Sequence, residues 1–194
     1  EGTALDQLGA EYRFHTPVYR TGPVAADGTL DGDLVLAASG DPNLSGRVGS
    51  DNSLAFENQD HSYGGDPHTR AVPGDPLLVV RALARQVAAK GIKRVVVAVY
   101  VDASLFPEGD RELGTGVVLS PIVVNDNVID VTVTPGADTG AAAAFVRAPV
   151  TAYVRFVSDA RTGARGSNPS ISWTADSTAP DGTHMVTIGG TVPA

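Results

Sequence analysis

Residues 119–135 read LSPIVVNDNVIDVTVTP, and this stretch decides the predicted fold. Two runs rich in Val and Ile, Val117–Val124 and Val128–Thr134, have the composition of β-strands. The polar Asn125-Asp126-Asn127 between them predicts an elbow, at which one strand ends and the next begins. Helix signals occur only before this elbow, so the boundary between two domains is expected there.

A helix that runs directly into a strand is predicted upstream of the elbow. Gly74-Asp75-Pro76 indicates a helix start, with Asp75 as the N-cap and Pro76 at the first helical position, and Gly91 closes the helix. The apolar run Ile92–Val101 predicts a strand covered on both faces. Together they form one leg of an α/β crossover unit. The helix face expected to be buried consists of Leu77, Val80, Ala84, Val87 and Ala88.

Shorter elements are predicted at the N-terminal end. Thr3–Leu8 has the pattern of a short helix closed by Gly9. Strands are expected at Tyr12–Thr21 and Asp33–Ala38. The sequence therefore predicts a helical stub over residues 1–10 and an α/β domain that ends near residue 126.

The remainder, residues 127–194, is expected to be a small all-β domain. Its turn dipeptides separate short runs of strand-forming residues, and the run Ala141–Ala144 is too short and too near Gly140 to form a helix. Besides Val128–Thr134, strands are predicted at Ala152–Val157, Ile171–Ala175 and Met185–Ile188. The chain as a whole should be a strand-rich, mixed α+β protein.

Several separated phrases of the sequence resemble one known family, and they occur in the right order. The resemblance is to the D-alanyl-D-alanine carboxypeptidase/endopeptidases, the penicillin-binding serine peptidases (peptidase S13) that trim peptidoglycan. It covers nearly the whole chain and matches only the inserted, non-catalytic region of these enzymes. The phrases are Leu8–Phe14, Gly32–Leu44, Gly74-Asp75-Pro76, Val101–Ser104 and Val124–Asn127.

The resemblance implies an exported enzyme, periplasmic or extracellular, whose catalytic domain is interrupted by a Rossmann-like domain and a β domain. Residues 1–10 would be the tail of the helix that carries the nucleophilic Ser, and any export signal would lie upstream. The expected partners are peptidoglycan peptides, bound through the parent enzyme. No catalytic residue is carried over to this chain by the resemblance.

The lysine motifs of such a catalytic site are missing from the sequence. The site needs a Ser one helical turn before a Lys and a second Lys in Lys-Thr-Gly, but Lys90 and Lys93 are the only lysines, and neither stands in such a motif. Ser50-Asp51-Asn52 spells the third motif, Ser-x-Asn, but precedes the elbow instead of following it. We expect the chain to be inactive by itself.

Composition excludes several other classes of function. A net charge of −8 and a pI near 4.8 disfavour binding to nucleic acid or anionic lipid. The chain has no Cys, which excludes disulfides and thiolate metal sites. No apolar run has the length of a membrane span. No Gly-rich phosphate loop follows a strand, so no nucleotide or other cofactor is expected.

A polar loop over residues 43–74 is the candidate ligand-binding segment. It carries His61, Tyr63 and His68, and as an alternative function the chain would be a stand-alone bacterial surface module that binds cell-wall glycan or peptide through them. The spacing matches no recurrent metal loop, so no metal is expected there. The three aspartates Asp27, Asp31 and Asp33 lack the EF-hand pattern and are interpreted as hairpin-turn residues.

A third hypothesis is a stand-alone hydrolase that uses Ser120 or Ser104 with one of the four histidines. Ser-His-Asp sites are assembled in space, so this hypothesis needs no sequence motif. However, no Gly-x-Ser-x-Gly nucleophile elbow occurs. Asp102, Ser104 and Ser120 are better interpreted as turn and strand-end residues.

Overall fold

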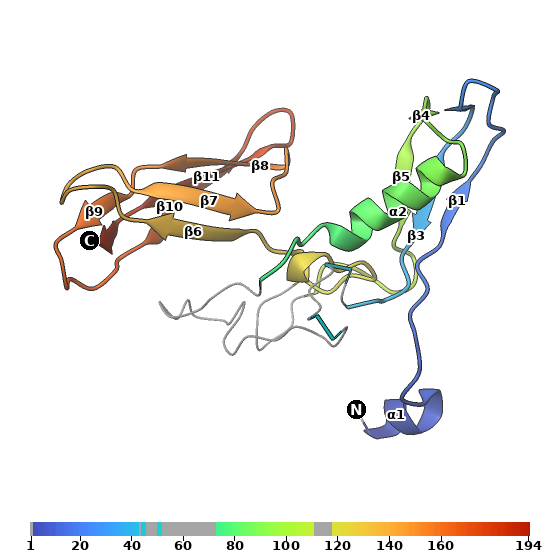
Figure 1. The fold of residues 1–194 in the computed structure, drawn as a ribbon, viewed down its shortest axis with the longest axis horizontal. Coiled ribbons are helices and arrows are strands. Elements are labelled where there is room, and N and C mark those ends of the chain that lie inside the picture. The colour runs from blue at the N-terminus through green and yellow to red at the C-terminus, as the bar shows by residue number, and fades with distance from the viewer. Residues whose placement is uncertain (1, 43, 46–49, 52–72, 111–117) are drawn as a thin grey trace. The chain divides into compact units, whose positions relative to one another are not determined.

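The computed structural model describes residues 2–42, 44–45, 50–51, 73–110 and 118–194 (Figure 1). The chain divides into two compact units: described residues up to Val128 belong to the first, and Ile129–Ala194 to the second. Strands outnumber helices in both, so the prediction of a strand-rich, mixed α+β chain is confirmed. None of the described helices is long and apolar enough to cross a membrane.

The first unit begins with a short helix and a strand. Helix α1, Gly2–Leu8, ends where Gly9 adopts a left-handed φ of 80° and donates its N–H to the carbonyl of Leu5 at 2.9 Å. This ending was predicted. Strand β1 covers only Val18–Arg20 of the strand expected over Tyr12–Thr21.

A three-stranded sheet with the order β1-β3-β5 forms the centre of the first unit. Strand β3, Leu34–Ala37, is antiparallel to β1 and parallel to β5, Val99–Asp102. Helix α2, Leu78–Ala89, lies between β3 and β5 in the sequence, so the predicted α/β crossover is present. A second, parallel pair joins β2, Thr29–Leu30, to β4, Arg94–Val95.

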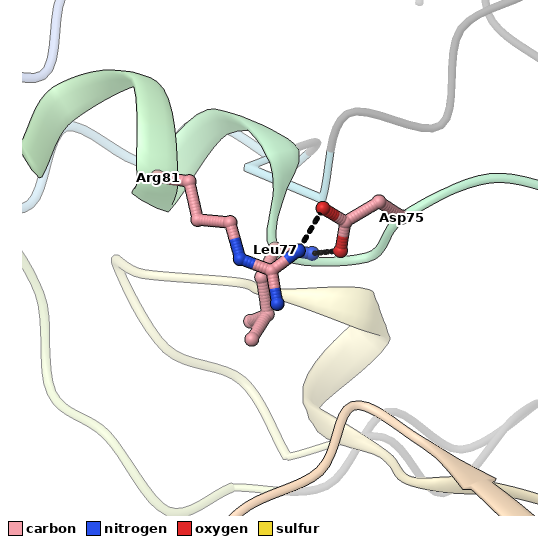
Figure 2. A network of polar contacts seen from close by, with 3 residues as sticks. All are labelled: Asp75, Leu77 and Arg81. Atoms are coloured by element: carbon pink, nitrogen blue, oxygen red, sulfur yellow. Dashed lines mark hydrogen bonds and ion pairs between the residues drawn. The ribbon is translucent and has the colours of Figure 1, made fainter. Parts of the chain in front are cut away.

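Helix α2 begins two residues later than predicted, and its N-cap residue is Leu77 instead of Asp75. The Asp75 Oδ1 atom accepts the Leu77 N–H at 3.0 Å, and the Asp75 carboxylate also pairs with the Arg81 guanidinium (Figure 2). The first N–H groups of a helix have no partner within the helix, and the Asp75 carboxylate satisfies one of them. At the other end, Gly91 has a φ of 87° and follows the last turn, as predicted.

The burial predicted for α2 and the following strand is wrong. No α2 residue is fully buried, and the half-buried ones are Val79, Ala82, Leu83 and Val87, whereas Val80, Ala84 and Ala88 are exposed. The run Ile92–Val101 forms two short strands instead of one, and Val99 is 68% exposed. An apolar run favours burial, but burial also needs a covering layer, which the local sequence does not specify.

The strand expected over Val117–Val124 is also absent where this segment is described. Residues 111–117 lie outside the described part, and only isolated bridges occur beyond them, including a parallel one between Ile122 and Asp41. Pro121 interrupts the run, and proline has no N–H to donate to a ladder. The segment leads instead into the short helix η1, Asn125–Asn127.

The second unit is built of strands, and no helix occurs in its described residues. Strands β6, Asp130–Thr134, and β7, Ala144–Ala148, form a hairpin. A mixed sheet has the order β10-β11-β8, in which β11, His184–Gly189, is parallel to β8, Val154–Ser158, and antiparallel to β10, Ser172–Thr178. Strands β9, Arg161–Gly163, and β12, Thr191–Pro193, pair in parallel.

The core of the second unit centres on β11, where the side chain of Ile188 is 0% exposed. Four strands were predicted to within about three residues at their ends, which is the usual uncertainty of such boundaries. Strands β7, β9 and β12 were not predicted, since each contains Ala, Gly or Pro and lacks a clear alternation.

Candidate functional site

The elbow has an unusual backbone conformation. Asn125, Asp126 and Asn127 have φ values of 55°, 51° and 55°, so three consecutive residues other than Gly are left-handed. Most side chains clash with the backbone in this region, whereas Asn and Asp tolerate it best after Gly. The residue types of the elbow are therefore those that its backbone requires.

Side-chain hydrogen bonds hold the elbow in place. Asn125, which is 1% exposed, donates from Nδ2 to the carbonyl of Val128 at 2.9 Å. Asn127 accepts the Val124 N–H on Oδ1 at 3.2 Å and donates from Nδ2 to the carbonyl of Ile122 at 3.3 Å. The two asparagines thus bind the backbone on both sides of the turn.

A segment distant in the sequence packs along the residues before the elbow. The Gly40 N–H donates to the Pro121 carbonyl at 2.8 Å, and the Leu44 N–H to the Val123 carbonyl at 3.2 Å. Leu44 itself is buried. We call residues 40–42, 44–45 and 120–127 the elbow cluster; it joins two of the phrases that carried the family resemblance.

Ser120 lies in this cluster and has a structural environment. Its Oγ atom donates to the Glu108 carboxylate and accepts the Ile122 N–H at 3.1 Å. None of the hydrogen bonds that the described residues make to this hydroxyl comes from an amine or an imidazole, the groups that activate a serine nucleophile. Glu108 was not singled out from the sequence, because no spacing or motif connects it to Ser120.

Ser104 and Asp102 form a turn at the end of β5, as predicted. The Ser104 N–H donates to Asp102 Oδ1 at 3.0 Å. Hydrogen bonds from the Ser104 hydroxyl and then from its N–H lower the pKa of Asp102. Both hydrogen bonds favour the charged form of the carboxylate, so Asp102 serves as an ionised hydrogen-bond acceptor in the turn.

The two lysines lie at the end of α2 and beyond it. Lys90 follows the helix as its C-cap, where a cation is favoured by the helix dipole. The Lys93 N–H donates to the carbonyl of Gly28 at 2.8 Å, at the start of the β4 segment.

The remaining candidates divide into described and undescribed residues. His61, Tyr63 and His68, and Asn52 of the Ser50-Asp51-Asn52 triplet, lie outside the described residues, so the ligand-binding loop stays a prediction. Asp27 accepts the Thr29 N–H at 2.9 Å, and this bond is the first cause of its lowered pKa. Among the described residues, no three His, Cys, Asp or Glu side chains form a group that could hold a metal ion.

Solved structures with a similar fold are penicillin-binding proteins. Penicillin binding protein 4 (dacB) from Haemophilus influenzae matches with a TM-score of 0.61 at 15% identity, over 99% of this chain and 36% of that one. The same protein complexed with a novel β-lactam matches with a TM-score of 0.54, also at 15% identity, over 99% of this chain and 34% of that one. The chain thus spans about a third of these proteins. The search of curated proteins gives no match.

The family comparison covers almost the entire sequence. The model of the D-Ala-D-Ala carboxypeptidase 3 (S13) family matches residues 2–194. This agrees with the resemblance that the separated sequence phrases predicted. The chain belongs to the D-Ala-D-Ala carboxypeptidase 3 (S13) family.

Proposed function

We propose that residues 1–194 are the inserted, non-catalytic region of an exported serine-type D-Ala-D-Ala carboxypeptidase/endopeptidase that remodels peptidoglycan. The observation that carries the proposal is a family match over residues 2–194 of a sequence that lacks both lysine motifs. These 194 residues lack the catalytic lysine motifs, so their role in the enzyme is other than catalysis. The proposed role is to shape the access of peptidoglycan peptides to the catalytic domain.

The fold supports this assignment in two ways. The chain corresponds to 36% of the penicillin-binding protein that it resembles, which leaves room in such a protein for a separate catalytic domain. The parallel strands β3 and β5 flank α2 in the sequence, which supports a Rossmann-like first domain. The proposed location is the periplasm or the cell exterior, where the peptidoglycan substrate lies.

The elbow cluster gives the proposed region a rigid element. Its buried Asn125 and the backbone bonds from Gly40 and Leu44 to residues 120–127 fix the end of the first domain. A surface that guides a substrate must keep its shape, and buried, satisfied hydrogen bonds provide such rigidity. The role proposed for the cluster is therefore positioning, with no chemistry at Ser120.

The test is acylation by penicillin. The purified chain is incubated with a fluorescent penicillin, and its intact mass is measured beside that of a penicillin-binding protein as a positive control. We expect no penicilloyl adduct, because neither lysine lies one helical turn after a serine. A mass increase of one penicilloyl group, lost in Ser50→Ala or Ser120→Ala, would refute the proposal.

A further inference from the structure

The second unit exposes the only tryptophan of the chain. Trp173 lies on β10 opposite Ile188 of β11, yet its side chain is 62% exposed, whereas Ile188 is 0% exposed. Directly paired residues share one face of a sheet, so Trp173 lies on the face that carries the core. An indole left uncovered beside a buried core residue provides a large apolar contact area with a polar N–H.

Other rings continue from Trp173 across the sheet. The Phe156 ring on β8 lies 6.2 Å from the Trp173 ring, measured between centroids, with 43° between the planes. Phe145 of the β6–β7 hairpin lies 6.4 Å from Phe156. The hairpin therefore contacts the sheet at Phe156 and leaves Trp173, on the edge strand, in solvent.

An arginine with one buried, unpaired donor atom completes the row. The Arg147 side chain from β7 is half-buried, and its Cζ atom lies 6.0 Å from the centroid of Phe156. Its Nε atom is buried and has no hydrogen-bond partner. Arginine is rarely buried without a partner, because an unsatisfied charged donor loses its hydration. A carboxylate bound by the rest of the guanidinium would offset part of this cost through charge-assisted hydrogen bonds.

We propose that Arg147, Phe156 and Trp173 form a binding site for a carboxylate-bearing sugar fragment, specifically a muramyl peptide of peptidoglycan. The apolar C–H face of a pyranose ring stacks on the Trp173 indole. The peptide carboxylate accepts hydrogen bonds from the planar Arg147 guanidinium, which suits a carboxylate better than an ammonium does. The inference rests on the proposed function, which supplies the cell-wall ligand.

The charge distribution of the chain favours this unit as the place for an acidic ligand. Residues 129–194 contain four Arg and five Asp, so they contribute only −1 to the chain's net charge of −8. The remaining −7 falls on residues 1–128. A muramyl peptide is therefore repelled less by the second unit than by the first.

The experiment uses the intrinsic fluorescence of the chain, since Trp173 is its only tryptophan. Muramyl dipeptide is titrated into the purified chain, and we expect a saturable change in emission. Arg147→Gln should weaken binding roughly tenfold, as expected for the loss of a charge-assisted hydrogen bond. Arg155→Gln is the matched control, because Arg155 is the exposed neighbour of Phe156 on β8 and points to the opposite face.

Two further probes separate the parts of the ligand. A neutral chitin trisaccharide and an acidic peptide without sugar should each bind at least about tenfold more weakly than muramyl dipeptide, because each lacks one of the two contacts. Equal binding of either probe, an absence of saturation, or equal loss in Arg147→Gln and Arg155→Gln would overturn the proposal.

Folding of the variants is checked by far-ultraviolet circular dichroism. If Arg147→Gln does not fold, Trp173→Phe, at an exposed position, provides the test by calorimetric titration, and unchanged affinity would overturn the site. The result is also independent of the acylation test. A failed titration leaves the absence of a penicilloyl adduct intact, whereas an adduct would refute the proposed function without altering the Arg147 comparison.

Discussion

Replacing Asn125 should show how strongly the elbow depends on one buried amide. Asn125→Ala removes the Nδ2 donor and leaves the carbonyl of Val128 without its 2.9 Å partner. An unsatisfied buried polar group costs about 1–3 kcal/mol. Alanine at a φ of 55° adds about 1 kcal/mol, because its Cβ clashes in the left-handed region. We expect the first unit to lose roughly 2–4 kcal/mol in its free energy of unfolding.

Asn125→Gly separates the two contributions. Glycine also lacks the amide, but it adopts the left-handed conformation without strain. The glycine variant should therefore be about 1 kcal/mol more stable than Asn125→Ala, because it lacks the strain of the left-handed alanine. Asn127→Gly is a matched control at an exposed position with the same φ of 55°. It should cost less than either substitution at Asn125, because water replaces its lost hydrogen bonds.

The assay is urea unfolding with two probes. Far-ultraviolet circular dichroism of α2 reports on the first unit, and Trp173 fluorescence reports on the second. Asn125→Ala should lower the midpoint of the dichroism transition. A free energy within about 0.5 kcal/mol of the unsubstituted chain, the range typical of surface substitutions, would refute the reasoning. So would a glycine variant that is less stable than the alanine variant.

Three further outcomes follow from single contacts. Asp75→Ala should destabilise the start of α2 by about 1 kcal/mol, measured by thermal unfolding, because it removes the hydrogen bond to the Leu77 N–H; an unchanged melting temperature would contradict this. Ser104→Ala should raise the pKa of Asp102, which carboxyl NMR can follow. Because folding lowers this pKa, the ionised Asp102 stabilises the folded chain at pH values above the ordinary aspartate pKa. This contribution to the free energy of unfolding is lost as the pH falls through the pKa of the folded state. Gly190→Ala should destabilise the second unit more than Gly182→Ala: both have φ values near 90°, but only the Cβ at 190 meets a backbone carbonyl.

The elements that the sequence predicted well are those with local signals. Gly9 and Gly91 end their helices in left-handed conformations, and strands β6, β8, β10 and β11 follow runs of β-branched and aromatic residues. Such signals depend only on neighbouring residues. The family resemblance likewise came from short phrases, and the match over residues 2–194 confirmed it.

The failures concern contacts between distant segments. The run Ile92–Val101 is apolar apart from Lys93 and Arg94, but its burial depends on layers that other parts of a structure supply. The bond between Ser120 and Glu108 joins two residues twelve positions apart in the connection between β5 and η1, and the row from Arg147 to Trp173 joins residues on separate strands. No periodicity or motif encodes these pairs, so they become visible only when the strands are placed.

The elbow shows why a sequence phrase can identify a family even where no lysine motif accompanies it. Three successive left-handed residues favour Gly, Asn and Asp, because most other side chains clash with the backbone there. Gly would supply the conformation but neither the Asn125 bond to Val128 nor the two Asn127 bonds. The phrase Asn-Asp-Asn is thus dictated jointly by conformation and hydrogen bonding. A recognisable motif in a region without the catalytic lysines is then expected on structural grounds alone.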